Sequence, residues 1–225
     1  MLLCLGAGSL LSMPLAGAMA ARFGCRNVMI VTTVMIFLCL PLLTLAPNAW
    51  LLGASLFLFG AGVGAMDCTM NMQAVVMERE SGRAMMSGFH AFYSIGGFVG
   101  AAVMTGLLSV KLGPIPATLI GTTAIALIAA SVMKHWRDER LQQDGPLLAL
   151  PKGIVLFLGI LAFVVFLAEG SMLDWSAVFL ADVRDVQPSL AGLGYVVFAL
   201  TMTAARLFGD SVVERLGRVR AIVAG

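Results

Sequence analysis

The sequence is poor in charge and in the residues that build catalytic or metal-binding clusters. Only 12% of its 225 residues are charged and only two are histidines, whereas an ordinary soluble domain carries about 25% charged residues. The four cysteines are isolated, so we expect free thiols and no metal site. The net charge of +2 gives no sign of a nucleic-acid partner. No triad or phosphate loop indicates an enzyme, and we expect no cofactor.

Hydrophobic residues make up 60% of the chain and are gathered in long runs. Runs of roughly 20 residues are long enough to cross a bilayer, and short polar segments separate them. We therefore predict an all-α integral membrane protein with about seven transmembrane helices. The first run has no basic leader or cleavage site, so we interpret it as a span rather than a signal peptide. The predicted spans are 1–21, 28–46, 50–77, 86–110, 117–133, 153–181 and 190–213, and 221–225 begins an eighth run.

Lysine and arginine are distributed unequally between alternate loops. Most of the 14 lie in one set of loops, which the positive-inside rule places in the cytoplasm. Lys111 and Arg184 lie in the opposite loops, and Arg206 lies within an apolar run. The basic loops are 22–27, 78–83, 134–152 and 214–220.

Two of these basic loops resemble each other. Ala21-Arg22-Phe23-Gly24-Cys25-Arg26 and Glu214-Arg215-Leu216-Gly217-Arg218 each close an apolar run. Two halves of equal orientation, joined by a long cytoplasmic segment, are the plan of transporters built from parallel repeats. The predicted parts are an amino-terminal half, an inter-half linker and the start of a carboxy-terminal half, at 1–133, 134–152 and 153–225.

The repeated loop resembles the signature of the major facilitator superfamily, Gly-x-x-x-Asp-Arg-x-Gly-Arg-Arg/Lys. The first copy departs from it at Ala21, where the family has its acid, and at Cys25, where the family has an arginine. The second copy keeps its acid, and Asp210 stands at the position of its first glycine. The matching residues are Gly17, Arg22, Gly24 and Arg26 in the first copy and Glu214, Arg215, Gly217 and Arg218 in the second.

This resemblance implies a helical bundle of two pseudo-repeats, with the loops forming a cytoplasmic gate. The motif's acid is expected to meet the N-terminus of an adjacent helix and the basic side chains of its own loop. Arg206 and Asp210, four residues apart, are expected to pair with each other beside the gate. The alternative is that the loops are simple basic anchors. By the same resemblance the chain corresponds to helices two to eight and the start of helix nine of a twelve-helix protein, and so looks like a fragment.

A narrower resemblance covers two other segments. Asp67 to Asn71, with Glu78, Arg83 and the run 87–96 after them, is similar to helices four and five of the fucose-permease-like branch. Residues 168–175 are similar to helix seven of an uncharacterised group of that branch in the bacterial inner membrane. The resemblance implies a multi-pass protein of that membrane, a small polar solute and protons as partners, and we expect a monomer.

Asp67 is the foremost candidate for a functional residue. An ionised carboxylate in the middle of an apolar run costs at least about 2.5 kcal/mol, so we expect it to be used or paired. Burial favours the neutral acid, which would let Asp67 load and release a proton; a structural hydrogen bond is the alternative. Asn71 lies one helical turn later on the same face. It would orient the acid, bind a substrate hydroxyl or join two helices.

Three other polar residues are weaker candidates. Glu169 lies within the sixth run and would line a cavity or pair with a basic residue elsewhere. His90 would titrate near neutral pH or simply pack. Asp174 lies near the outer interface, where a boundary role is the simpler interpretation. For Arg206, a role in substrate binding is the alternative to the pair with Asp210.

Together these features indicate a secondary transporter that works by alternating access. It would move a small polar solute, such as a sugar, together with protons. A non-transporting scaffold or sensor, or an inactive truncated product, is the alternative from another class. A drug exporter is the third interpretation, and it would require an aromatic, apolar cavity in place of the polar stripe of Asp67 and Asn71.

Overall fold

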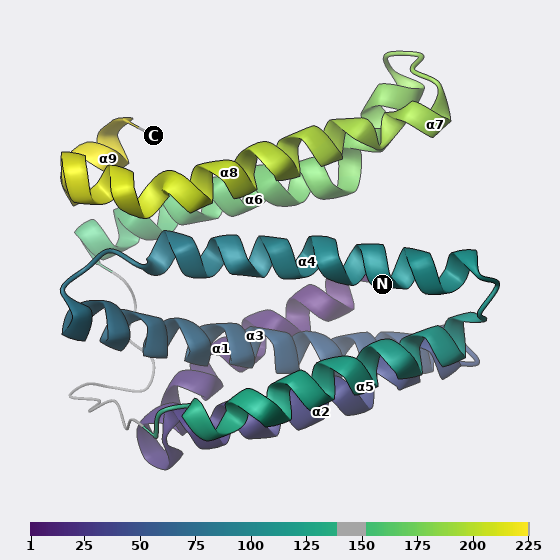
Figure 1. Cartoon of the computed structure of the whole chain (residues 1–225), viewed down its shortest axis with the longest axis horizontal. Helices are drawn as coiled ribbons and strands as arrows, with labels where there is room; N and C mark the ends of the chain where they lie inside the picture. Colours follow the sequence, from purple (N-terminus) through teal and green to yellow (C-terminus); the bar gives the residue numbers. More distant parts are fainter. Residues whose placement is uncertain (139–151, 225) are drawn as a thin grey trace. The chain divides into compact units, whose positions relative to one another are not determined.

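The computed structural model describes residues 1–138 and 152–224, in which every regular element is a helix (Figure 1). Seven of these helices are long and apolar enough to cross a membrane, which confirms the predicted class and number of spans. They are α1 (Leu2–Phe23), α2 (Cys25–Leu45), α3 (Ala49–Ser81), α4 (Met86–Ser109), α5 (Pro114–Val132, continued by the 3₁₀ turn η1, Met133–His135), α6 (Ile154–Asp182) and α8 (Leu193–Leu216). The shorter helices are α7 (Pro188–Ala191) and α9 (Arg218–Ala224).

The basic segment 22–27, expected to be a loop, is helical apart from one residue. α1 ends at Phe23 and α2 begins at Cys25, so that Gly24 alone separates them. The reason is that a glycine can reverse the chain in a single residue. Residues 139–151 of the expected linker 134–152 lie outside the described residues.

The chain divides into two compact units. The first comprises Met1–Arg83 and Gly96–Leu148, and the second comprises Ala84–Ile95 and Ala149–Gly225. α4 therefore contributes its first turns to the second unit and its remainder to the first. Since these units are not the predicted halves, the division of the chain into two repeats stays a prediction.

In the first unit, α3 is the central helix, packed against both α1 and α2, and α2 packs against α5. Glycines allow the contact between α1 and α3. A methyl group added to Gly8 would overlap the backbone carbonyl of Phe57, and one added to Gly60 would overlap that of Leu5. Such close backbone approach through small residues is the usual way in which membrane helices pack.

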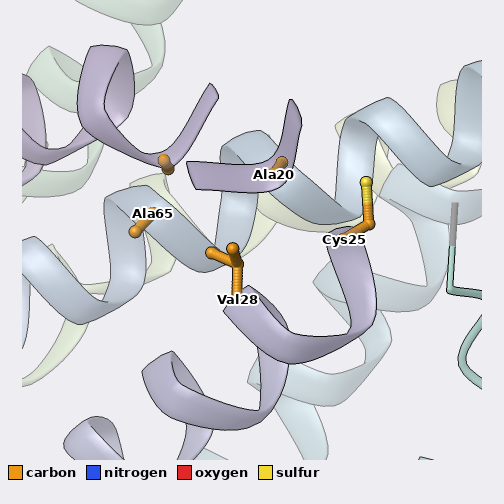
Figure 2. Packing of buried hydrophobic residues seen from close by; sticks show 5 residues of the cluster. Ala20, Cys25, Val28 and Ala65 are labelled. Atoms are coloured by element: carbon orange, nitrogen blue, oxygen red, sulfur yellow. The ribbon is translucent and has the colours of Figure 1, made fainter. Parts of the chain in front are cut away.

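The buried apolar cluster of this unit also consists mainly of small side chains. Figure 2 shows where α1, α2 and α3 meet in this cluster. The members are Ala16, Ala20, Cys25, Val28 and Ala65, with Cys68 and Met72 packed against them. All four cysteines are free thiols, as predicted from their isolation in the sequence.

The second unit is built around α6 and α8, which lie side by side (Figure 1). α7 packs against α6, and α9 follows α8 directly. The large apolar side chains of α6, such as Phe163 and Phe166, are exposed, as expected for a helix that faces lipid or further helices.

Candidate functional site

Asp67 and Asn71 form a local polar pair near the middle of α3. The Asn71 amide donates hydrogen bonds to the backbone carbonyl of Asp67 at 2.9 Å and to its Oδ1 at 3.2 Å. Both side chains are half-buried. Across residues 1–138 and 152–224, no basic side chain is paired with Asp67. The carboxylate is thus held by a neutral group of its own helix, as the spacing of the two residues suggested.

The C-terminal end of α3 is tied to the segment that follows α5. Gln73, which is buried, donates a hydrogen bond to the backbone carbonyl of Arg137 at 2.6 Å. The two terminal nitrogens of Arg137 each bind a different oxygen of Glu80, at 2.5 and 3.2 Å. This is the two-pronged geometry that guanidinium and carboxylate groups prefer.

In the second unit, Arg206 joins three helices. Arg206 lies on α8, and its Nη2 donates hydrogen bonds to Glu169 of α6, at 3.0 Å to Oε2 and 3.3 Å to Oε1. Its Nη1 donates a hydrogen bond to the hydroxyl of Ser94 of α4 at 2.8 Å. The predicted pair of Arg206 with Asp210 is therefore wrong. A carboxylate on a neighbouring helix satisfies the arginine, and Asp210 has partners of its own. Of the two interpretations of Glu169, the structure supports a pair with a basic residue.

Asp210 caps the N-terminus of α4. Its Oδ1 accepts a hydrogen bond from the backbone N–H of Ser87 at 2.9 Å, and its Oδ2 accepts one from that of Gly88 at 2.6 Å. The first N–H groups of a helix have no partner within the helix and lie at the positive end of its dipole, so a carboxylate there is stabilising. Gly209 permits the approach, because a methyl group on it would overlap the Ser87 hydroxyl.

This contact comes from an acid that lies one helical turn before the motif acid. The family resemblance assigned the contact with a helix N-terminus to the motif acid, which is Glu214 in this chain. Asp210, at the position where the family has a glycine, makes a contact of this kind. In the sequence, this contact was signalled only by the presence of an acid, Asp210, four residues before Glu214. Asp210 also lies four residues after Arg206, and that spacing suggested a pair with Arg206 instead.

The two copies of the motif share one backbone geometry. Gly24 has φ 86° and ψ 148°, and Gly217 has φ 81° and ψ 153°. Each donates its N–H to the carbonyl of the residue four positions earlier, Ala20 or Val213, at 2.9 Å in both cases. Only glycine adopts this region readily, so the repeated glycine is explained by the turn it makes.

The remaining motif residues surround these turns. Gly17 makes an ordinary contact, since an added methyl group would lie 3.6 Å from Cε of Met72. Arg22 is exposed and stacks on the Phe23 ring, 5.2 Å from its centroid, and Arg26 is half-buried. Arg215 and Arg218 are exposed. Their role in a gate stays a prediction.

His90 and Asp174 take no part in the side-chain hydrogen bonds described above. His90 is half-buried on α4, and its backbone carbonyl accepts a hydrogen bond from Ser94 at 3.2 Å. Asp174 is exposed on α6. In the described part of the chain no side-chain hydrogen bond is formed by either residue, and their proposed roles stay predictions.

Comparison with known sequences decides the family. A profile of the Major Facilitator Superfamily matches residues 1–225. The chain belongs to this superfamily. It is 46% identical, over 226 aligned positions, to an uncharacterized MFS-type transporter of Yersinia pestis, covering 100% of this chain and 59% of that protein.

Two further relatives come from other bacteria, Sinorhizobium fredii and Rhizobium meliloti. The chain is 36% identical over 221 positions to an uncharacterized transporter of Sinorhizobium fredii, covering 96% of this chain and 58% of that protein. It is 33% identical over 226 positions to membrane protein MosC of Rhizobium meliloti, covering 100% of this chain and 55% of that protein. The chain thus spans less than two thirds of the length of these relatives. No solved structure gives a significant match.

Proposed function

We propose that the protein is a secondary active transporter of the bacterial inner membrane that moves a small polar solute, such as a sugar, together with protons. Membership of the superfamily and the seven membrane-length helices support this proposal. Two of the relatives are themselves named as transporters. We also retain the fucose-permease-like branch, with the helix numbering that it implies, as part of the proposal.

The observation that carries the proposal is that the Asp67 carboxylate is hydrogen-bonded to the amide of Asn71. A neighbouring cation favours the ionised form of a carboxylate. A carboxylate held only by a neutral amide lacks this stabilisation and can gain or lose a proton when water access changes. The contacts of Asp67 with Asn71 are of the second kind. In the proposed cycle, Asp67 takes a proton from one side of the membrane and releases it to the other, and Asn71 keeps the acid oriented.

The motif residues form the gate in this proposal. The cap that Asp210 places on α4 is a contact between two helices that can break and re-form. The turns at Gly24 and Gly217 set the direction in which α2 and α9 leave the preceding helices. Opening toward the cytoplasm would separate Asp210 from α4, and closing would restore the two hydrogen bonds. The gate needs no partner protein, and a monomer suffices.

The test uses the protein expressed from its complete gene and reconstituted into vesicles that contain a pH-sensitive dye. A panel of neutral and acidic sugars is added outside, and solute-dependent proton entry is recorded. Asp67→Asn should abolish proton-driven accumulation while solute exchange between equal concentrations continues, because a neutral amide cannot carry the proton.

Asp182→Asn, at the end of α6, serves as the matched control and should behave as the wild type. Undiminished accumulation in Asp67→Asn would remove the coupling role. A well-folded wild-type protein that transports nothing in the panel would favour a scaffold or sensor instead.

A further inference from the structure

The pair of Arg206 and Glu169 differs in geometry from the pair of Arg137 and Glu80. Arg137 offers two nitrogens to the two oxygens of Glu80. Arg206 offers only Nη2 to both oxygens of Glu169, and its Nη1 is held by the hydroxyl of Ser94, a neutral group. A carboxylate that gained both nitrogens of Arg206 would have the more favourable two-pronged arrangement. Glu169 is therefore a partner that another carboxylate can replace.

The position of the pair suits such an exchange. Arg206 lies in the middle of α8 and Glu169 in the middle of α6, far from the ends of both membrane-length helices. Their side chains are 21% and 31% exposed, so neither is fully buried among the described residues. Ionisable residues inside membrane helices commonly mark the pathways of solutes and ions.

Charge balance determines what happens to the Glu169 side chain when another carboxylate displaces it from Arg206. An arginine remains charged in proteins, and an unpaired charge at this depth is costly. Arg206 therefore needs an anion in every state of the site. A displaced Glu169 would be a second uncompensated charge, and such a carboxylate favours its protonated form.

We propose that Arg206 and Glu169 form a binding site for solutes that carry a carboxylate, and that binding transfers one proton from solvent to Glu169. The solute carboxylate binds Arg206 through Nη1 and Nη2, the hydrogen bonds from Arg206 to Glu169 and Ser94 break, and Glu169 becomes a neutral acid. One negative charge and one proton enter together, so the net charge of the site does not change. The inference rests on the proposed transporter function and narrows its solute to acids such as sugar acids.

Other titratable groups near the pair are few. α7 packs against α6 and contains none. On α6, Asp174 and Asp182 follow Glu169. On α8, Tyr195 and Asp210 lie on the same helix as Arg206, with Glu214 and Arg215 at its end, and His90 and Tyr93 lie on the first turns of α4. Of these groups in the described chain, Arg206 is the one bonded to Glu169. A change in proton uptake caused by Glu169→Gln therefore reports on this pair.

The test measures equilibrium binding by the purified complete protein in lipid nanodiscs. The probes are acetate, D-lactate and D-gluconate, each compared with a neutral analogue: acetamide, lactamide and D-glucose. Binding is followed by tryptophan fluorescence, since Trp175 lies on α6, and proton uptake by a pH dye in weak buffer. At least one carboxylate should bind more tightly than its analogue and take up about one proton, so its affinity should rise about tenfold per unit fall in pH.

The variants separate the two roles. Arg206→Gln should weaken carboxylate binding by about ten- to a hundredfold, the range for a hydrogen bond to a charged group, and Arg206→Lys should keep part of the affinity. Glu169→Gln should still bind the carboxylate, but without proton uptake and with no pH dependence. Asp182→Asn, on the same helix, is the control and should match the wild type. If Arg206→Gln does not fold, the double variant Arg206→Gln/Glu169→Gln removes both charges and replaces it.

The proposal is overturned if none of the carboxylates binds, if the neutral analogues bind equally well, or if Glu169→Gln still takes up a proton. These outcomes do not depend on transport. Undiminished accumulation in Asp67→Asn, with intact proton-linked carboxylate binding, would contradict only the coupling role of Asp67. Transport of neutral sugars without carboxylate binding would contradict only the inference about Arg206 and Glu169.

Discussion

The two units of the molecule hold their helices together in different ways. In the first, α1 and α3 meet backbone to backbone through Gly8, Gly60 and Gly64. In the second, the contacts between α4, α6 and α8 include an ion pair and a charged helix cap, made by Arg206 and Asp210.

The difference bears on which contacts can change during a transport cycle. Close backbone packing is short-ranged and has no alternative partner, so separating α1 from α3 would lose it entirely. A charged side chain can exchange one partner for another of the same sign, including a solute or water. We therefore expect the glycine contacts to behave as rigid structure and the contacts of Arg206 and Asp210 to rearrange.

The largest effect is expected from Gly60→Val. The added side chain overlaps the carbonyl of Leu5, and an overpacked contact of this kind costs about 3 kcal/mol. Unfolding by denaturant in lipid bicelles measures the loss. Gly159→Val is the matched control, because Gly159 of α6 has nothing within 4 Å of its added carbon. Equal losses in the two variants would contradict the contrast between the units.

A smaller effect is expected from Asp210→Ala. Two hydrogen bonds to a carboxylate are lost, and we expect a destabilisation of about 2 kcal/mol. Asp210→Asn, which keeps an acceptor, should lose about half as much. Hydrogen exchange should be faster at the amides of Ser87 and Gly88, and unchanged protection there in Asp210→Ala would show that the cap is not maintained in solution.

The smallest effect is expected from Gly24→Ala and Gly217→Ala. Because both glycines have the same unusual φ and ψ, each substitution should cost about 1 to 2 kcal/mol. Gly6→Ala, near the start of α1 where nothing lies within 4 Å of the added carbon, should cause no loss and provides the control. Costs at the two turns that differ by more than about 1 kcal/mol would contradict their structural equivalence.

Predictions from the sequence succeeded where the relevant contact is local. The hydrogen bond of Asn71 to Asp67 follows from a spacing of one helical turn. The same rule failed for Arg206 and Asp210, which are also four residues apart. Arg206 pairs with Glu169, 37 residues away, and Asp210 with Ser87, 123 residues away. Spacing within one helix could not reveal these competing partners.

The sequence by itself determined the class, the number of membrane-length helices and the repeated turn at Gly24 and Gly217. These depend on the length of apolar runs and on the conformational freedom of one residue, which are local properties. Only the tertiary structure decided which charge meets which, because an intramembrane ion selects its partner among side chains brought to the same depth by neighbouring helices. Arg206 found that partner on α6, and Asp210 found its own at the start of α4.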